Sequence, residues 1–397
     1  MLAAVVVTLL VQAMVVVAIV GPAVGAPVIS PAFALPESAV GLYMALAYLG
    51  AVLSALYSGD PIRRHGPIRA SQAGLMLCAI GLALLASARL PIAIAGAIAI
   101  GLGYGPITPA SSDILVRTTP PQRLAVVFSI KQTGVPLGGV LAGLVVPALT
   151  LAIGWQPALL ALAATCALVA AAAQIVRDEY DDRRGADAAS GARGVLASLA
   201  ESMRLVTTRA ALRRLTVCAF VFAGLQLSLT TYLVSYLNLG LGWSLVAAGG
   251  ALSATQAAGV VGRIGWGALS DAGLGARRTL LLLAALMIAS CLSVGIVERD
   301  MPHALVLLLV IVFGASAVGW NGVFLAHIAR VAPPGQVGAA TGASTAFTFL
   351  GTVVWAPIFG LIADAAGYAS AFAAFALPVG ACVLLLGGAR DEGSGVG

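Results

Sequence analysis

The chain has 397 residues, of which 60% are hydrophobic and 9% are charged, and its mean hydropathy is +1.04. A soluble domain has about 25% charged residues, so this composition excludes an ordinary soluble protein. The formal net charge of +6 comes from 21 basic and 15 acidic residues; because most of the arginines lie between apolar segments, it indicates membrane topology and no nucleic-acid partner.

Apolar segments of about 20 residues recur along the chain, each long enough to cross a ~30 Å hydrocarbon core as a helix. The sequence therefore predicts an all-α membrane protein. Its twelve transmembrane helices are expected near residues 3–29, 39–58, 70–88, 91–115, 124–153, 157–176, 215–238, 243–269, 279–297, 304–328, 336–363 and 368–388.

One polar stretch interrupts this pattern. Residues 177–214 hold eight arginines and six acids, and their middle part has the Gly/Ala/Ser composition of a flexible linker. Apolar residues at helical spacing near 194–206 predict a helix lying on the membrane surface. We expect three parts: six helices in 1–176, a cytoplasmic linker in 177–214, and six helices with a short tail in 215–397.

The basic residues give the orientation by the positive-inside rule. The loops after every second helix carry arginines, whereas only Arg89 and Arg299 lie on the opposite side. We therefore expect a multi-pass protein of the cytoplasmic (inner) membrane with both termini in the cytoplasm.

The two halves repeat each other. ILVRTTPPQRL, between predicted helices 4 and 5, aligns with HIARVAPPGQV, between helices 10 and 11, at an offset of 213 residues. Gly59 and Gly267, at the ends of helices 2 and 8, align at an offset of 208. Halves that share orientation are typical of folds with two bundles related by an axis along the membrane normal.

With these features the chain resembles the major facilitator superfamily over nearly its full length. The family's loop motif, roughly G-x-x-x-D-R-x-G-R-R, is kept in the second half as GALSDAGLGARR and is altered in the first half, where Arg63 stands in place of the acid. The resemblance implies two pseudo-symmetric six-helix bundles and a monomer with no cofactor. It implies gating and structural roles for the motif residues Gly267, Asp271, Arg277, Arg278, Gly59, Arg64 and Gly66. We expect the Asp271 carboxylate to lie near a helix N-terminus, whose free amides favour it.

Polar residues inside the predicted helices are the candidates for substrate contact. A buried amide needs a partner helix, water or a ligand, so each is either interhelical glue or part of a cavity lining. The candidate substrate-binding residues are Gln12, Tyr104, Lys131, Gln132, Gln226, Gln256, Arg263, Asn321 and Trp355, with Ser111 as a further polar position.

Lys131 and Arg263 are cations within apolar segments, where a charge costs roughly 2.5–3.5 kcal/mol and marks a functional site. Three explanations for Lys131 are open: pairing with Asp113 near the end of helix 4, binding of an anionic substrate, or loss of its proton through burial. The third would leave a neutral amine. No acid lies in predicted helices 1 and 7, where it would attract a cationic drug.

His327, near the inner end of helix 10, is either the residue for proton coupling, since histidine titrates near neutral pH, or an interfacial residue without function. No nucleotide-binding, metal-binding or hydrolase motif is present, so we expect neither an enzyme nor a metal site. The five cysteines read as core residues.

The leading hypothesis is a secondary transporter, proton-coupled or coupled to another ion, for a small anion such as a monocarboxylate. The alternatives are a proton-driven exporter of hydrophobic or neutral compounds and a non-transporting membrane receptor. The exporter is weakened because the helix 5 motif, G-P-x-x-G-G in many exporters, appears only as GVPLGG, in which Pro136 would kink the helix.

Overall fold

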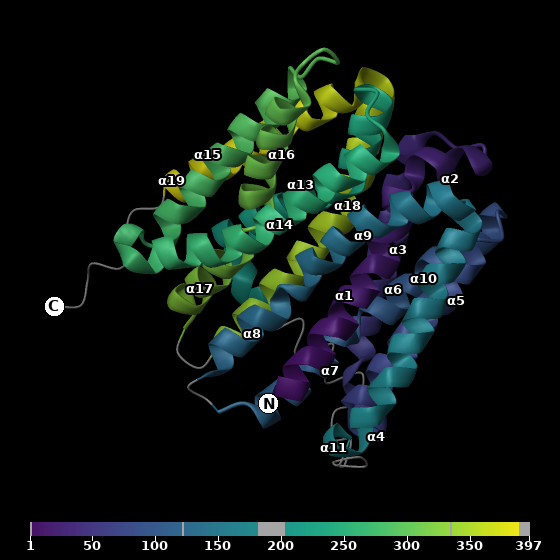
Figure 1. The fold of residues 1–397 in the computed structure, drawn as a ribbon. Coiled ribbons are helices and arrows are strands. Elements are labelled where there is room, and N and C mark those ends of the chain that lie inside the picture. The colour runs from purple at the N-terminus through teal and green to yellow at the C-terminus, as the bar shows by residue number, and fades with distance from the viewer. Residues whose placement is uncertain (1, 121–122, 182–202, 334–335, 389–397) are drawn as a thin grey trace. The chain divides into compact units, whose positions relative to one another are not determined.

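The computed structural model describes residues 2–120, 123–181, 203–333 and 336–388, and these residues form helices and no β-strand (Figure 1). The helices of the first half are α1 (Leu2–Val24), α2 (Ala26–Ala32), α3 (Val40–Tyr57), α4 (Gly59–His65), α5 (Pro67–Leu85), α6 (Leu90–Tyr104), α7 (Ile107–Thr118), α8 (Leu124–Gln132), α9 (Gly134–Ile153), α10 (Trp155–Ala172) and α11 (Arg177–Tyr180). Those of the second half are α13 (Ala210–Ser235), α14 (Leu245–Leu269), α15 (Ala276–Gly295), α16 (His303–Ala317), α17 (Asn321–Val331), α18 (Val337–Ala374) and α19 (Ala376–Gly387).

In the described part of the chain, eleven helical stretches are long and apolar enough to cross a membrane. The last of them, Ala339–Gly387, has 49 residues and would extend for about 70 Å at 1.5 Å per residue, more than twice the ~30 Å hydrocarbon core. Gly367, with φ 84° and ψ 161°, interrupts it. The stretch is therefore two segments, and the predicted twelve transmembrane helices are confirmed.

Several of these segments are broken within their length. The fourth consists of α6 and α7, the fifth of α8 and α9, and the tenth of α16 and α17. The fifth ends its first part at Gln132, four residues before Pro136, because a proline ring collides with the carbonyl four residues earlier. The predicted kink is thus present, and it places Lys131 at the end of a helix.

The backbone repeats between the halves as the sequence predicts. Gly66 (φ 94°, ψ 157°) precedes α5 and Gly275 (φ 79°, ψ 151°) precedes α15. Gly154 (φ 85°, ψ 158°) precedes α10, and Gly367 begins the corresponding last segment. A side chain disfavours this positive φ, so glycine recurs at the same two corners of each half.

Contacts divide the chain into two compact units. The first unit is Met1–Val195 with Thr230–Ala257, and the second is Leu196–Leu229 with Ala258–Gly397. The three-part division at the linker remains a prediction. The predicted surface helix near 194–206 lies mostly outside the described residues, although residues 203–208 are helical.

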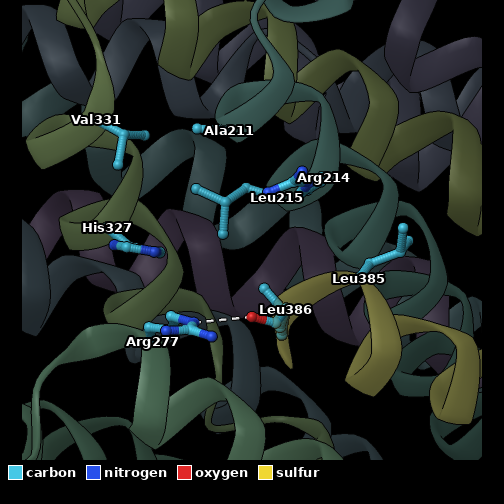
Figure 2. A pocket seen from close by; sticks show the side chains of 8 residues that line it. All are labelled: Ala211, Arg214, Leu215, Arg277, His327, Val331, Leu385 and Leu386. Carbon is cyan, nitrogen blue, oxygen red and sulfur yellow. Dashed lines mark hydrogen bonds between the residues drawn. The ribbon is translucent and has the colours of Figure 1, made fainter. Parts of the chain in front are cut away.

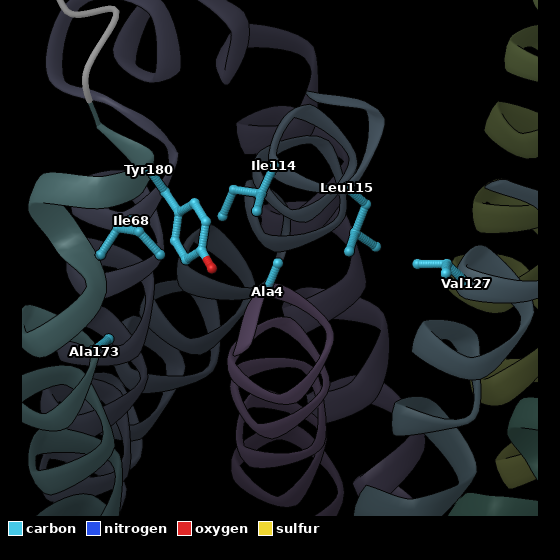
Figure 3. Close-up of a cluster of buried hydrophobic side chains, with 7 residues drawn as sticks. All are labelled: Ala4, Ile68, Ile114, Leu115, Val127, Ala173 and Tyr180. Carbon is cyan, nitrogen blue, oxygen red and sulfur yellow. The ribbon is translucent and has the colours of Figure 1, made fainter. Parts of the chain in front are cut away.

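In the first unit α5 packs against α6 and α10, and α1 packs against α9 (Figure 1). Apolar side chains gather where α1, α5 and α7 meet the end of α11: Tyr180, Ile68 and Ile114 surround Ala4 (Figure 3). All four are at most 2% exposed. This cluster fixes the end of the unit that leads into the linker.

In the second unit α15 packs against α16, α18 and α19. Aromatic rings fill the space between α16 and the two last segments: Phe359 lies 4.7 Å from Phe372 and 6.0 Å from Phe375, and Phe313 lies 6.0 Å from Phe372, between ring centroids. These four side chains are at most 1% exposed. The core of this unit is therefore aromatic, and it holds the segment after Gly367 against the rest.

Candidate functional site

Lys131 is the only lysine of the chain, and its side chain is 1% exposed. It lies in the last turn of α8, where the free carbonyl ends of a helix favour a positive charge. Its Nζ donates to Thr108 Oγ1 at 3.4 Å and to Gln132 Oε1 at 3.3 Å. Both acceptors are neutral, so among the described residues the ammonium has no counter-ion.

Gln12 extends this group on α1. Its Oε1 accepts a hydrogen bond from Thr108 Oγ1 at 3.4 Å. The Thr108 hydroxyl has one hydrogen, so accepting from Lys131 directs that hydrogen to Gln12. The Gln12 side chain is 1% exposed, and its Nε2 has no hydrogen-bond partner in the described part of the chain. We call Gln12, Thr108, Lys131 and Gln132 the lysine cluster; it ends in an unused buried donor.

Asp113 does not neutralise Lys131. Its Oδ2 lies 2.8 Å from Nη2 of Arg117, one turn further along α7. The same Arg117 nitrogen donates to the carbonyl oxygen of Tyr180 at 2.8 Å. The explanation that Asp113 pairs with Lys131 is therefore wrong, because a cation four residues away on the same helix occupies the carboxylate.

Two other predicted polar residues of the first unit serve packing. Gln256 Nε2 donates to Thr230 Oγ1 at 3.0 Å, and a Cβ on Gly139 would lie 2.8 Å from Gln256 Cδ. The glycine therefore lets α9 approach the Gln256 side chain closely. Ser111 donates back to the Thr108 carbonyl on its own helix at 3.0 Å.

In the second unit the amide Gln226 on α13 is the centre of a similar group. Its Oε1 accepts from Trp320 Nε1 at 3.0 Å and from Asn321 Nδ2 at 3.2 Å. Both donors lie where the tenth segment breaks between α16 and α17. Trp320 is 0% exposed and had not been singled out from the sequence. We call Gln226, Trp320 and Asn321 the tryptophan cluster.

Arg263 on α14 is half-buried, and its Nε donates to the carbonyl oxygen of Val318 at 3.1 Å. That carbonyl lies at the break after α16, where the helix leaves acceptors without intrahelical donors. One turn away, Trp266 Nε1 donates to the Ala315 carbonyl at 2.8 Å. Arg263 thus ties α14 to the end of α16 through backbone acceptors.

The two aromatic candidates pack against other rings. The Trp355 ring centroid is 5.1 Å from Phe375 and 6.0 Å from Phe220, and Trp355 Nε1 is buried without a partner among the described residues. Tyr104, at the end of α6, lies 5.9 Å from Tyr48 on α3. Trp355 and Tyr104 thus pack as core residues do, and the Nε1 donor of Trp355 is unused among the described residues.

The loop motif of the second half makes contacts at the ends of the helices. Asp271 Oδ1 lies 3.3 Å from Nη2 of Arg330, and the two side chains are 74% and 54% exposed. Its described partner is thus an arginine side chain and not the helix N-terminus that we expected. Arg277 donates to the carbonyl oxygens of Leu386 at 2.8 Å and Gly387 at 2.7 Å, which satisfies the end of α19. Arg278 is exposed and Gly267 is half-buried.

In the first half, different contacts stabilise the corresponding turn before α5. Gly59 and Arg64 are exposed, and Arg63 pairs with Asp60. At the start of α5, Asp181 accepts from the backbone amides of Ile68 at 2.8 Å and Arg69 at 3.2 Å. Its carboxylate, 1% exposed, lies so close to Gly66 that any side chain there would collide with it.

Asp181 was not found from the sequence because it caps a helix more than a hundred residues earlier. One signal existed: α5 begins with Pro67 directly after Gly66, and neither residue supplies a side-chain acceptor for the free amides. An acceptor from elsewhere in the chain was therefore needed.

His327 on α17 is half-buried and lines a hollow together with Arg277 and Arg214 (Figure 2). In the described residues no group of three or more His, Cys, Asp or Glu side chains could hold a metal ion.

Twelve apolar helical segments, repeated halves and polar clusters at helix breaks define a polytopic helical membrane protein. The family model of the Major Facilitator Superfamily matches residues 6–326, and the chain belongs to this superfamily. The resemblance inferred from the loop motifs is confirmed. Members of this family are transporters and not enzymes.

Two uncharacterised MFS-type transporters of Mycobacterium tuberculosis, from strains CDC 1551 and H37Rv, are 28% and 27% identical to the chain over 273 residues. Each alignment covers 69% of this chain and 59% of the relative. The chain is thus aligned with less than two thirds of these relatives' length.

Solved structures share the fold at low identity. A bacterial homologue of the human lysosomal transporter Spinster has a TM-score of 0.73 and 17% identity, with 97% of this chain and 94% of that chain covered. A D-xylose-proton symporter has a TM-score of 0.75 and 15% identity, with 96% of both chains covered. The nucleoside transporter NupG has a TM-score of 0.78 and 12% identity, with 96% and 98% covered. These similarities support the twelve-helix transporter fold.

Proposed function

We propose that the protein is a secondary active transporter that moves a small organic anion, such as a monocarboxylate, by alternating access. The observation that carries this proposal is Lys131, a buried ammonium whose described polar partners are neutral. A buried charge without a partner is costly, and ionisable residues inside membrane proteins mark substrate and ion pathways. A bound anion would supply the missing counter-charge.

The charge of the lysine cluster favours a monoanion. One ammonium balances one carboxylate, whereas a dianion would leave a buried negative charge, and a cationic compound would be repelled. The single ammonium therefore favours a monocarboxylate over phosphate-like dianions and over cationic drugs.

Gln12 offers a hydrogen-bond donor for the second carboxylate oxygen of the proposed ligand. Lys131 Nζ would bind one oxygen, and Gln12 Nε2, buried and unused among the described residues, would donate to the other. Hydrogen bonds to an ionised carboxylate are shorter and stronger than those between neutral groups. In this arrangement Thr108 and Gln132 hold the ammonium in place.

Proton coupling is part of the proposal, with His327 as the candidate group, because an unperturbed histidine titrates near neutral pH. It is supported by the shared fold with a D-xylose-proton symporter. We also propose the membrane orientation that the arginines indicate: the protein lies in the inner membrane and its linker lies in the cytoplasm. A protease site inserted at Ser190 that is cut only from outside the cell would contradict this orientation.

The test is ligand binding by purified protein. A panel of monocarboxylates, including lactate and benzoate, is compared with inorganic anions, neutral sugars and cationic drugs by thermal shift, since a ligand that binds the folded state raises apparent stability. For the best anion, Lys131→Ala should weaken binding roughly ten- to hundredfold, which corresponds to about 1.5–3 kcal/mol for a lost charge-assisted contact. Lys131→Arg should restore part of it.

Arg263→Ala tests whether the second intramembrane cation also favours anions. We expect a smaller loss, because its guanidinium is already bound to the Val318 carbonyl. Arg89→Gln removes a positive charge from a loop and is the matched control, with unchanged affinity. If both Lys131→Ala and Arg263→Ala bind the anion as the parent does, or if only neutral and cationic compounds bind, the anion proposal is wrong. The proton-driven exporter then takes its place.

A further inference from the structure

A small hollow of about 40 Å³ lies at one end of the second unit, where four helices meet. Its lining comes from the start of α13, the start of α15, the end of α17 and the end of α19 (Figure 2). The lining residues are Ala211, Arg214, Leu215, Arg277, His327, Val331, Leu385 and Leu386. This is the end that the arginines predict to be cytoplasmic.

The polar part of this lining is basic. Three of the eight side chains are Arg214, Arg277 and His327, and none of the eight is acidic. Arg277 is held in position by its hydrogen bond to the Leu386 carbonyl, with His327 beside it (Figure 2). Arg214 is half-buried and makes no hydrogen bond or ion pair with the described residues. Arg214 thus has a half-buried guanidinium without a described partner beside two other basic residues, an arrangement that favours an anion.

The surroundings of the hollow are apolar. Leu215, Val331, Leu385 and Leu386 complete its wall. Beyond it, α13 and α19 lie side by side, since Cys218 Sγ is 3.9 Å from the Cys382 carbonyl oxygen. Val217 on α13 is 43% exposed, and Leu384 on α19 is 78% exposed. An anion held at the hollow would therefore have an exposed hydrocarbon surface next to it, along the direction of the membrane span.

We propose that this hollow binds the phosphate headgroup of an anionic phospholipid, with an acyl chain lying on α13 and α19. Basic pockets between transmembrane helices on the cytoplasmic side are suited to such headgroups. Free phosphate would use the same guanidinium groups and leave the apolar strip unoccupied. The site joins the starts of α13 and α15 to the ends of α17 and α19, so an occupying lipid would stabilise the second unit.

The experiment is native mass spectrometry of the full chain in detergent, with lipid added in steps. The probes are dioleoylphosphatidylglycerol, dioleoylphosphatidylcholine with the same chains, and glycerol 3-phosphate, which has the anion without chains. We expect one phosphatidylglycerol to bind more tightly than the others. Arg214→Gln should weaken that site roughly fivefold, because a basic residue near an anionic lipid contributes about 1 kcal/mol. Arg213→Gln is the matched control: this exposed neighbour on α13 donates to the Thr207 carbonyl and does not line the hollow.

Three results would overturn the proposal. Equal binding of phosphatidylcholine would mean that the site recognises chains only, and equal binding of glycerol 3-phosphate would make it a site for free phosphate. Parent-like phosphatidylglycerol binding by folded Arg214→Gln would place the lipid elsewhere. A several-fold gain of lipid in a variant with Asp391→Asn and Glu392→Gln would make the acidic C-terminal sequence the occupant.

Discussion

The lysine cluster and the tryptophan cluster occupy corresponding places in the two halves. Gln12 and Gln226 are 214 residues apart, and Thr108 and Asn321 are 213 apart, close to the offset of the internal repeat. In each half the amide oxygen on the first helix accepts from a residue just after the break in the fourth helix. The shared fold therefore places an amide acceptor at the same point twice.

The two clusters differ in what completes them. In the second half Trp320 gives Gln226 a second donor, whereas the corresponding position 107 is an isoleucine. In the first half Lys131 adds a charge, whereas Ser344, 213 residues later, bonds Thr216 at 2.9 Å. One cluster is filled by a large side chain and is structural. The other keeps a charge and an unused donor, and these are the features of a ligand site.

The largest expected effect on stability is at the tryptophan cluster. Trp320→Ala should lower the free energy of unfolding by about 3–5 kcal/mol, because it removes a fully buried indole and leaves a cavity. Heating with a thiol-reactive dye measures this, since the five cysteines are buried in the folded protein. Trp320→Phe keeps most of the volume and should cost less. An unchanged melting temperature for Trp320→Ala would show that the tryptophan cluster does not hold the second unit together.

Next come the two amides, which should separate stability from binding. Gln226→Leu leaves the donors of Trp320 and Asn321 unpaired and should cost about 1–3 kcal/mol of stability. Gln12→Leu removes a donor that is already unpaired, so its stability cost should be below about 1 kcal/mol. Anion affinity should fall only in Gln12→Leu. Equal stability losses for both variants would end the distinction between a structural and a ligand cluster.

The corner before the third segment of each half provides a smaller contrast. Asp181→Ala removes the cap of α5 and should destabilise the protein by about 0.5–2 kcal/mol. Asp60→Ala, which removes a half-buried acid paired with Arg63 on the neighbouring α4, is the control and should change stability by less than about 1 kcal/mol. The thiol-dye assay compares them. If the two variants have the same melting temperature, Asp181 is not the residue that stabilises the turn before α5.

The smallest stability effect is expected for Asp271→Asn, because both side chains of the Asp271–Arg330 pair are exposed and such pairs contribute about 0–1 kcal/mol. Its expected effect is on gating: a lower transport rate with substrate affinity within a few fold of the parent. Transport into proteoliposomes and equilibrium binding are measured on the same preparation. A large loss of affinity in folded protein would move Asp271 into the binding site.

One ion pair of the site is already indicated by the sequence. Asp113 and Arg117 are four residues apart on one helix, a spacing at which opposite charges pair, so the sequence already favoured this ion pair over Asp113–Lys131. Thr108 was not singled out, because a threonine in an apolar helix is ordinary and only the fold brings it 3.4 Å from Lys131 Nζ. The Asp181 cap on α5 is likewise a contact between distant segments.

The sequence by itself determined the class, the twelve helices, the repeat of the halves and Lys131 as a cation of interest. These follow from local properties: the apolar length needed to cross a bilayer, the positions of arginines, and the cost of a charge within a span. The tertiary structure alone decided the neighbours of each polar group. Lys131 has neutral partners, and Gln226 accepts a hydrogen bond from Trp320, because breaks in the helices bring distant residues together. The order of residues along the chain does not encode which side chains then meet.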